Sequence, residues 1–554
     1  MNIRNVVLAV VLSVACLLVG YSETPTTHGP LDLLIVNARV VDGMGNPWFR
    51  ADVGIRDGRI AEIGRLEGQA ATRTIDAEDR ILSPGFVDMM GGRTYPLLED
   101  ADAAESKLRQ GITTMLAGEG TSEVPQNDDT IAGVPEAKRL GVTWRTYAEY
   151  DALFRNKGLR VNVVHTVGAA QVRRVVMGVE DGRPTPAQMD EMKAIVRQAM
   201  EDGAAGVSTA LIYPPGTYAT TDEIAELAKV AGEFGGSYFT HMRNESSKVL
   251  DAIREAIEIG DKGGVPVHIF HLKAAGEENW PLMAQSIALI KNARVQGKDV
   301  TADVYPYVRN GIGLRSFLRP RHYAEGADKF LATLSDPQVR QQLRKEVETT
   351  SDWENWYRHV GMNWDNVLVA KVSDSLDKNY EGKSLAQIAE MRNSDQWTTF
   401  FDLVEARGVS VNPKSMNEQQ KHLALRAEFI SVDTDAWPMN VNNVSSAHPR
   451  AFGAFARVLA KYVRDEKIIT LEKAIRKMTS LPANRLRLYD RGCIAPGMRA
   501  DLLIFDPANV QDNATFENPV AYSSGFDYVM VNGELVLDNG ESTPARPGRV
   551  LGRN

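Results

Sequence analysis

The chain has 554 residues, of which 43% are hydrophobic and 24% are charged, and its formal net charge at pH 7 is −9. These fractions are typical of a soluble globular protein, and the length fits one large domain with a smaller module. The mild negative charge and the lack of a Lys/Arg run argue against a nucleic-acid partner, which leaves a small molecule as the expected substrate.

The N-terminal residues have the composition of an export signal. Arg4 precedes an apolar run over residues 6–20, and polar residues follow it. We therefore expect a signal peptide at residues 1–22 and a periplasmic or secreted protein, with a lipid at Cys16 or an uncleaved anchor as alternatives. No later apolar run is long enough to span a membrane. After cleavage Cys493 is the single cysteine, so no internal disulfide is expected.

Both ends of the chain predict β-structure. Residues 31–64 alternate apolar and polar side chains around turn signals, which is typical of β-hairpins, and the segments 500–507 and 527–540 return to the same pattern. We therefore expect a small β-sandwich domain that is built from both termini, from residues 31–80 and 491–554.

The middle of the chain, residues 81–490, alternates predicted strands and helices, as a closed parallel (β/α)8 barrel requires. At residues 249–270 an amphipathic helix is followed by a strand apolar on both faces, which indicates a buried parallel sheet. A long helical stretch precedes the last strand, and it predicts an inserted lid or subdomain at about residues 310–425. The eight strands are expected at residues 81–89, 112–117, 161–167, 206–210, 237–240, 265–270, 300–304 and 428–432.

Two histidines occupy equivalent places in this pattern. His241 follows the fifth predicted strand and His271 follows the sixth, so both fall at the carboxyl ends of adjacent parallel strands. A (β/α)8 barrel builds its active site at that edge, and two imidazoles a strand spacing apart can share one metal ion. The alternative is a pair of unrelated polar residues at strand ends, but the equivalence of the two positions favours a metal site.

Several longer motifs stand out in the chain. They are GVSTALIYPPGTYATTDE (206–223), FTHMRNE (239–245), HLKAAG (271–276), ADVYPY (302–307), SMNE (415–418) and AHPRAFGAFARVLAKYVRDE (447–466). With these motifs the chain resembles, over residues 31–551, the N-acyl-D-amino-acid deacylase (D-aminoacylase) branch of the amidohydrolase superfamily. The resemblance implies a distorted TIM-like barrel with a flanking β-sandwich, and hydrolysis of an N-acyl amino acid, of D configuration, to a carboxylate and a free amino acid.

The resemblance also implies metal chemistry at particular residues. His241 and His271 match the two metal-binding histidines of the family. Asp435 matches the strand-eight aspartate that takes a proton from zinc-bound water and returns it to the leaving amine, which is general acid–base catalysis beside a Lewis acid. Asp433, two residues upstream, is the rival for this role.

Substrate contacts are implied for a second group of residues. Arg450 matches the arginine that holds the substrate carboxylate, for which a planar guanidinium can make two parallel bonds. Lys273 and one of the tyrosines Tyr305 and Tyr307 are expected to contact the substrate amide or carboxylate. The loop that begins at Tyr213, with two prolines, is interpreted as a wall of the pocket.

The sequence departs from the family pattern at one strand end. Met90 and Gly92 stand where relatives carry His-x-His after the first strand, and neither can replace imidazole on zinc. Glu119 lies nearest the position of a cysteine ligand in relatives, and two histidines with one glutamate form a known catalytic zinc set. We therefore expect one zinc per chain, bound by Glu119, His241 and His271.

Two other functions stay open at this point. A different amidohydrolase acting on dipeptides, cyclic amides or lactones would share the metal core, although Arg450 favours a substrate with a free carboxylate. A metal-free, degenerate binding protein would explain Met90 and Gly92, but it would not explain why the other site residues are all retained.

Overall fold

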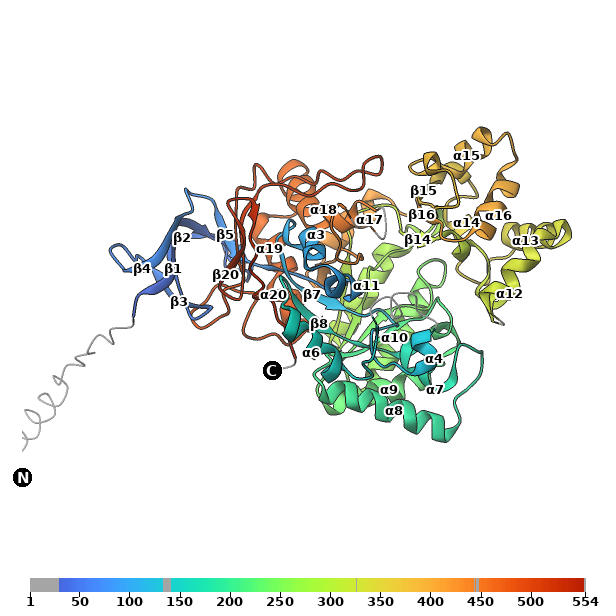
Figure 1. Cartoon of the computed structure of the whole chain (residues 1–554), viewed down its shortest axis with the longest axis horizontal. Helices are drawn as coiled ribbons and strands as arrows, with labels where there is room; N and C mark the ends of the chain where they lie inside the picture. Colours follow the sequence, from blue (N-terminus) through green and yellow to red (C-terminus); the bar gives the residue numbers. More distant parts are fainter. Residues whose placement is uncertain (1–28, 133–140, 325, 443, 445–447, 553–554) are drawn as a thin grey trace, which may run out of the picture.

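A computed structural model describes residues 29–132, 141–324, 326–442, 444 and 448–552 of the chain. Three parts lie in a row in Figure 1: a β-sheet formed from both ends of the chain, a central barrel, and a mostly helical unit drawn in yellow. The predicted signal peptide at residues 1–22 lies outside the described residues. None of the helices in the described part of the chain combines the length and apolarity that crossing a membrane requires.

The small sheet confirms that the two termini build one β-domain. Its strands are β1 (Leu31–Val40), β2 (Phe49–Arg56), β3 (Arg59–Gly64), β4 (Ala71–Asp76), β5 (Ile81–Pro84), β18 (Leu502–Phe505), β19 (Phe526–Val531), β20 (Glu534–Asp538) and β21 (Glu541–Ser542). Their order is β21-β20-β19-β18-β5-β1-β2-β3, with β4 parallel to β1. The two ends of the chain meet where β18 runs antiparallel to β5. The core of this domain contains Ile35, Val53 and Ile504.

The barrel is a ring of parallel strands, as predicted. In chain order they are β6 (Phe86–Asp88), β7 (Ile112–Ala117), β8 (Asn162–His165), β9 (Val167–Gly168), β10 (Gly206–Ala210), β11 (Ser237–His241), β12 (Val267–Ile269), β13 (Val300–Val304) and β17 (Ile430–Val432). The third strand is interrupted at Thr166, so that β8 pairs with β7 and β9 pairs with β10. Within the described residues β17 and β6 form no ladder, which makes the barrel a distorted one.

One predicted strand was wrong in its extent. Residues 81–89 were expected to form a single barrel strand, but β5 pairs with β1 and β18 in the small sheet, and only β6 joins the barrel. Because the residues of both strands are buried, their apolar pattern alone does not show where the chain passes from one sheet to the other.

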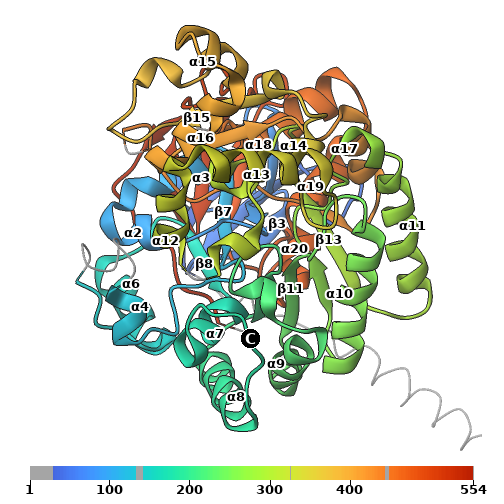
Figure 2. The same cartoon turned by 90° about the vertical axis from the view of Figure 1, so that its right-hand side faces the viewer.

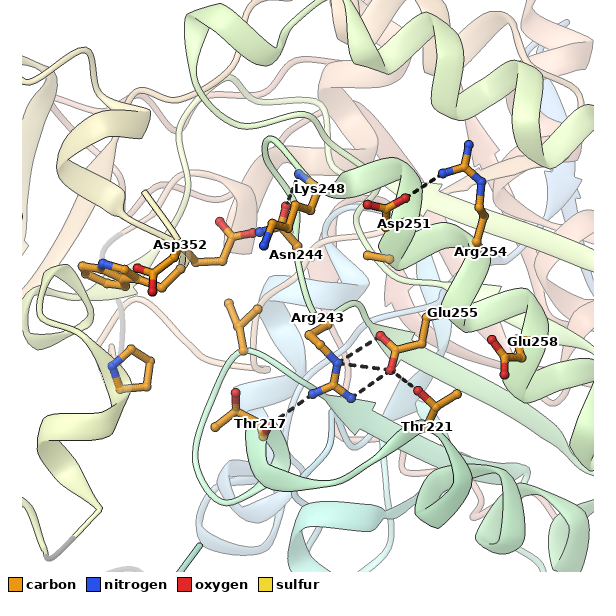
Figure 3. Close-up of a pocket in the computed structure, with 15 residues that line it drawn as sticks. Thr217, Thr221, Arg243, Asn244, Lys248, Asp251, Arg254, Glu255, Glu258 and Asp352 are labelled. Carbon is orange, nitrogen blue, oxygen red and sulfur yellow. Dashed lines mark hydrogen bonds and ion pairs between the residues drawn. The ribbon is translucent and has the colours of Figure 1, made fainter. Parts of the chain in front are cut away.

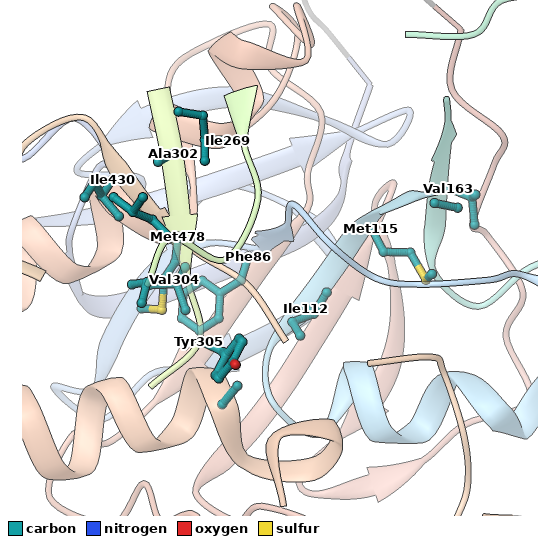
Figure 4. Close-up of a cluster of buried hydrophobic side chains, with 14 of the residues drawn as sticks. Phe86, Ile112, Met115, Val163, Ile269, Ala302, Val304, Tyr305, Ile430 and Met478 are labelled. Atoms are coloured by element: carbon teal, nitrogen blue, oxygen red, sulfur yellow. The ribbon is translucent and has the colours of Figure 1, made fainter. Parts of the chain in front are cut away.

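Helices cover the outside of the barrel, and Figure 2 shows several of them around it. The neighbouring helices α7 (Ala169–Met177), α8 (Pro186–Glu201), α9 (Thr221–Glu233), α10 (Val249–Gly263), α11 (Leu282–Val295) and α17 (Glu418–Arg426) contact one another in sequence. On α10 the predicted apolar stripe, including Val249, Ile253 and Ala256, is buried. Apolar side chains such as Phe86, Met115 and Ile430 belong to a large hydrophobic cluster (Figure 4), in which Phe86 stacks on Phe455 of a covering helix. The remaining helices of the barrel region are α2 (Tyr95–Glu99), α3 (Glu105–Leu108), α4 (Asp128–Ala132), α6 (Tyr147–Lys157), α18 (Arg450–Arg457), α19 (Leu471–Met478) and α20 (Ser480–Arg485).

The inserted unit between β13 and α17 has its own sheet and its own core. The sheet is antiparallel, in the order β14 (Ile312–Gly313), β16 (Ser410–Pro413) and β15 (Val367–Lys371). The helices are α12 (Ala327–Leu331), α13 (Pro337–Thr349), α14 (Trp356–His359), α15 (Leu385–Met391) and α16 (Gln396–Ala406). Trp364 stacks on Phe400 with ring centroids 5.0 Å apart, in a hydrophobic cluster separate from that of the barrel. The helix α17 that follows packs on α11 of the barrel.

Candidate metal centre

Three predicted ligands meet at the carboxyl edge of the barrel. Nδ1 of His241, at the end of β11, lies 2.7 Å from Oε1 of Glu119, and Nε2 of His271 lies 3.3 Å from the same oxygen. All three ligand atoms lie within 4.8 Å of one another, and no other group of three or more His, Cys, Asp or Glu side chains among the described residues has this geometry. These donors suit a zinc ion, because imidazole nitrogen and carboxylate oxygen are both ordinary zinc ligands.

A tight turn after β7 carries Glu119 to this position. Gly120 has φ +65°, and a Cβ on it would lie 2.3 Å from the backbone nitrogen of Ala210 on the neighbouring strand β10, so only glycine fits. Burial opposes the charge of Glu119, but hydrogen bonds with His241 and His271 lower the pKa of its carboxyl to about 2. The carboxylate is therefore ionised at any physiological pH.

Two residues of this site have a backbone conformation with positive φ, which residues other than glycine rarely adopt. His271 has φ +35° and Asp435 has φ +44°. The backbone N–H of His271 donates to the carboxylate of Asp303, which also lies 2.9 Å from Nε2 of the buried His268. Strain that is held in place by such a network is common at functional sites, because it fixes the direction of the side chain.

A buried glutamate that the sequence analysis did not single out links both histidines. Oε1 of Glu245 lies 2.9 Å from Nδ1 of His271 and 2.6 Å from Nζ of Lys273, and Oε2 lies 3.5 Å from Nε2 of His241. A carboxylate behind a metal-binding histidine fixes the tautomer and orientation of the ring. The signal available in the sequence was its place four residues after His241 in the FTHMRNE motif.

The predicted catalytic aspartate and the predicted substrate-binding arginine contact each other. Nη1 of Arg450, at the start of α18, lies 2.5 Å from Oδ2 of Asp435. Burial raises the pKa of Asp435, and Arg450 and His271 partly offset this effect. Asp433 is fully buried instead, and burial together with the nearby charge of Asp303 raises the pKa of its carboxyl well above the usual value. Of the two aspartates, Asp435 is therefore the one beside the metal ligands and Arg450.

The two tyrosines have different surroundings. Three cations surround the ring of Tyr305: its centroid lies 4.8 Å from Cζ of Arg450, 4.7 Å from Nζ of Lys421 and 5.7 Å from Nζ of Lys273. Its buried hydroxyl has no hydrogen-bond partner among the described residues. The hydroxyl of Tyr307 donates to the carbonyl of Pro449 at 3.4 Å, so Tyr307 supports the turn before Arg450.

Apolar packing surrounds the end of the first strand, where Met90 and Gly92 lie. A Cβ on Gly92 would lie 2.2 Å from Cδ1 of Trp437, and the side chain of Met90 is packed in a hydrophobic cluster with Met89 and Leu116. Apolar side chains thus fill the place where relatives carry the His-x-His ligands that this sequence lacks.

A fully buried lysine closes the barrel beside this strand end. Nζ of Lys107, on α3, donates to Oδ2 of Asp88 at 2.7 Å, to Oγ1 of Thr434 at 2.6 Å and to the carbonyl of Ala436 at 2.7 Å. Asp88 also accepts the backbone N–H of Thr434 at 3.0 Å. These bonds join the end of β6 to the loop after β17, where strand pairing is missing, and they hold the loop that carries Asp435.

Replacing Lys107 with methionine should lower the free energy of unfolding by about 3–5 kcal/mol, because Asp88 would be left as an unpaired buried charge. Urea unfolding followed by circular dichroism measures this change. The double variant Asp88→Asn/Lys107→Met should be less destabilised than the sum of the single variants. An unchanged unfolding midpoint for Lys107→Met would show that the buried bonds do not stabilise the closure.

Two histidines and a carboxylate that converge on the carboxyl edge of a parallel barrel are the arrangement expected of a metal-dependent barrel hydrolase. Comparison with known proteins supports this class. The model of the Amidohydrolase family matches residues 73–337 and 431–537, and that of the urease alpha-subunit N-terminal domain matches residues 18–82. The N-acyl-D-glutamate deacylase of Alcaligenes xylosoxydans xylosoxydans is 33% identical over 95% of this chain and 97% of its own length.

Two further relatives agree in sequence and in structure. The D-aminoacylase of the same organism is 31% identical over 95% of this chain and 98% of its own length. The structure of an N-acyl-D-glutamate deacylase from Bordetella bronchiseptica, complexed with zinc and a phosphonate mimic of the tetrahedral intermediate, has a TM-score of 0.77. It is 31% identical, and the match covers 95% of this chain and 100% of that one. The chain belongs to the amidohydrolase family, in its D-aminoacylase branch.

Proposed function

We propose that the protein is an exported, zinc-dependent deacylase that hydrolyses the linear amide bond of N-acyl-D-amino acids. The observation that carries this proposal is the convergence of Glu119, His241 and His271 beside the pair of Asp435 and Arg450. The names of the relatives support the substrate class. The apolar run near the N-terminus supports export, which fractionation of expressing cells would test.

The donor set fits a single zinc ion. Nδ1 of His241, Nε2 of His271 and a carboxylate oxygen of Glu119 would hold it, since these are the atoms that converge. When bound, zinc supplies a Lewis acid that lowers the pKa of water to about 7. The filled space around Met90 and Gly92 supports one ion per chain rather than two.

Asp435 and Arg450 have two different roles in the proposed reaction, proton transfer and substrate binding. Asp435 holds the proton that leaves the attacking water and delivers it to the nitrogen of the leaving amine. Arg450 binds the α-carboxylate of the substrate, because a guanidinium has further N–H donors beyond the one that bonds Asp435. The α-carboxylate of the substrate would compete with Asp435 for Arg450. Substrate binding would therefore release the carboxylate of Asp435 to act as the base, and it would orient the amide at the same time.

The proposal is tested by metal content and hydrolysis together. Purified protein is analysed by elemental mass spectrometry and is then assayed against N-acetyl-D-amino acids, their L enantiomers and a hydantoin, which lacks the carboxylate. About one zinc per chain and turnover of the D compounds is the expected result. Preference for L compounds or for hydantoin would overturn the substrate class, and a protein that takes up no metal and hydrolyses nothing would instead be a binding protein.

Replacing Glu245 with glutamine should weaken zinc binding by about 10–100-fold, because the carboxylate that orients both histidines is lost. Competition with a fluorescent chelator measures the dissociation constant. Glu255→Gln is a matched control, since Glu255 lies on α10 and pairs with Arg243, which belongs, like Glu245, to the loop after β11 (Figure 3). Equal losses in the two variants would mean that Glu245 acts on general stability and not on the ligands.

Zinc binding should also depend on pH through His271. Burial and the nearby Lys273 oppose a positive charge there, but three surrounding carboxylates outweigh them and raise the pKa of His271 in the metal-free site to about 9. Below that pH a proton must leave the ring before zinc binds, so affinity should rise about tenfold per unit between pH 7 and 9. Chelator competition across this range measures it, and a flat profile would contradict a protonated His271.

A further inference from the structure

A cavity of about 740 Å³ lies between the loop that joins β1 to β2 and the barrel helices α17 and α19. Its wall includes Glu428, which precedes the amino end of β17, whereas His241 ends β11 and His271 follows β12. Because the barrel strands are parallel, the cavity and the metal centre lie at opposite edges of the barrel. Figure 1 shows the small sheet and the inserted unit on opposite sides of the barrel in the same way.

Five basic side chains line this cavity, although the whole chain has a formal net charge of −9. They come from the end of α17, from the turn after the π-helical segment Val458–Asp465 and from α19, and they are Arg426, Lys467, Lys473, Arg476 and Lys477. Among the described residues Glu428 is the only acidic one in the wall. A cleft whose walls carry mainly one sign of charge concentrates ligands of the opposite sign, so this cavity favours an anion.

The basic side chains of the cavity lack the partners that their neighbours have. Within the described part of the chain, none of the five forms an ion pair, either with Glu428 or with another carboxylate. Close by, His422 of α17 and Lys461 both pair with Glu466, at 2.9 and 2.5 Å, and Arg464 pairs with Asp465 at 2.8 Å. Carboxylates of the chain thus neutralise the basic groups around the cavity but not those in its wall.

Uncharged groups hold two of the five cations in place. Nη1 of Arg476 donates to the carbonyl of Glu428 at 3.2 Å, and Nζ of the buried Lys477 donates to the carbonyl of Ile430 at 2.9 Å. Burial and the charge of Arg476, with a smaller contribution from Lys473, lower the pKa of Lys477 to about 7. Like charges therefore destabilise one another here, and a bound anion would relieve that repulsion.

A second cavity shows the contrast. It has about 540 Å³ and lies beside the loop after β11 (Figure 3). Arg243 there is bonded to Glu255, and Arg254 is bonded to Asp251. Carboxylates of the chain already neutralise these guanidinium groups, so this second cavity offers no comparable anion site.

The rest of the wall of the cationic cavity defines the ligand further. It is apolar, with Met44, Leu425, Val463, Ile468, Ile469 and Leu471. A ligand that fills the cavity therefore combines an anionic group with an apolar part. One carboxylate has a single charge and two oxygens, whereas a phosphate monoester has up to two charges and three terminal oxygens. A phosphate group thus matches several cations better than a carboxylate does.

We propose that this cavity is a second binding site, which binds the phosphate group of a phosphate ester whose apolar part lies against the apolar wall. Arg426 and Arg476 can each bond two phosphate oxygens, and Lys467 and Lys473 add point charges. The ester can be a soluble molecule or the head group of an acidic phospholipid, since both present the same group. The site does not depend on the proposed function, because it lies at the other edge of the barrel.

Two measurements on the zinc-loaded protein test the site and separate the two sources. Calorimetry compares phenyl phosphate with benzoate, and co-sedimentation compares phosphatidylcholine vesicles with vesicles that also contain phosphatidic acid. For a soluble ester we expect phenyl phosphate to bind at least about tenfold more tightly than benzoate, and for a lipid we expect sedimentation with the acidic vesicles alone. Affinity should fall about tenfold in Lys467→Gln and in Lys473→Gln and about 100-fold in the double variant, because each removes one charged contact.

Lys345→Gln is the matched control. Lys345 is exposed on α13 of the inserted unit, as Lys467 and Lys473 are at the cavity, and it does not line the cavity. It should bind both probes as the wild type does, and circular dichroism and zinc content should be unchanged in all variants. Phenyl phosphate bound at the zinc would persist in the double variant, so only the binding that this variant loses belongs to the cavity.

Three results would overturn the inference. The first is a wild type that binds neither phenyl phosphate nor the acidic vesicles. The second is binding that the double variant retains in full or that Lys345→Gln loses equally. The third is benzoate bound as tightly as phenyl phosphate without any binding to the acidic vesicles, which would show a site for carboxylates instead.

Discussion

Replacing Asp435 with asparagine should lower kcat by about 10²–10⁴-fold, because an amide cannot accept the proton of the attacking water or pass it to the leaving amine. The side chains are nearly isosteric, so the fold and the metal ligands should be retained. Steady-state kinetics with an N-acetyl-D-amino acid measures kcat, and elemental mass spectrometry measures the zinc that remains. Full activity at full metal content would remove Asp435 from the mechanism.

Asp433→Asn is the control for this experiment. Burial and the neighbouring Asp303 raise the pKa of Asp433 well above its usual value, which favours the neutral form of its carboxyl. An asparagine is uncharged and nearly isosteric, so kcat should change far less than in Asp435→Asn. If the two variants exchanged their effects, Asp433 would be the acid–base residue.

The positions of the two histidines could be predicted because they depend on local patterns. An amphipathic helix between two buried strands places His241 and His271 at the same edge of a parallel sheet, whatever the rest of the chain does. Residues that follow a strand end are fixed in space by that strand. This is why Glu119, although it departs from the family pattern, also lies at the site.

Contacts between distant segments could not be predicted in the same way. Lys107 and Thr434 are more than 300 positions apart, and their bond depends on how the barrel closes between its first and last strands. A lysine in a short helix ordinarily predicts an exposed charge, since burying an ammonium group costs free energy unless several acceptors surround it. The division of residues 81–89 between two sheets was hidden for a related reason, because both sheets bury apolar side chains.

The inserted unit posed a third difficulty. Its helices and strands have ordinary amphipathic patterns, but these do not tell which of its surfaces faces the barrel. Arg174 of α7 and Arg315 of the inserted unit are far apart in the sequence, so no local pattern places them on one cavity between the barrel and this unit. Their position on one cavity follows from the docking of the inserted unit against the loop at Tyr213, which only the structure shows.

Replacing His241 with alanine should weaken zinc binding by more than the 10–100-fold expected for Glu245→Gln, because a ligand atom is lost and not only its orientation. Without added zinc the activity should fall by at least about 10³-fold, since the Lewis acid contributes several kcal/mol to the transition state. Zinc content after gel filtration and kinetics at saturating zinc measure the two effects. The second measurement separates lost affinity from lost chemistry, because excess zinc restores occupancy but cannot replace the missing imidazole.

His165→Ala is the matched control. His165 lies on β8 of the same barrel, but it stacks on Tyr147 with ring centroids 4.7 Å apart and lies 3.3 Å from Asp151. Its removal should leave a void in the core and lower thermal stability without changing zinc content. If His241→Ala kept its zinc and its activity while His165→Ala lost both, the metal would have to lie on the third strand, and the assignment of the centre to Glu119, His241 and His271 would be wrong.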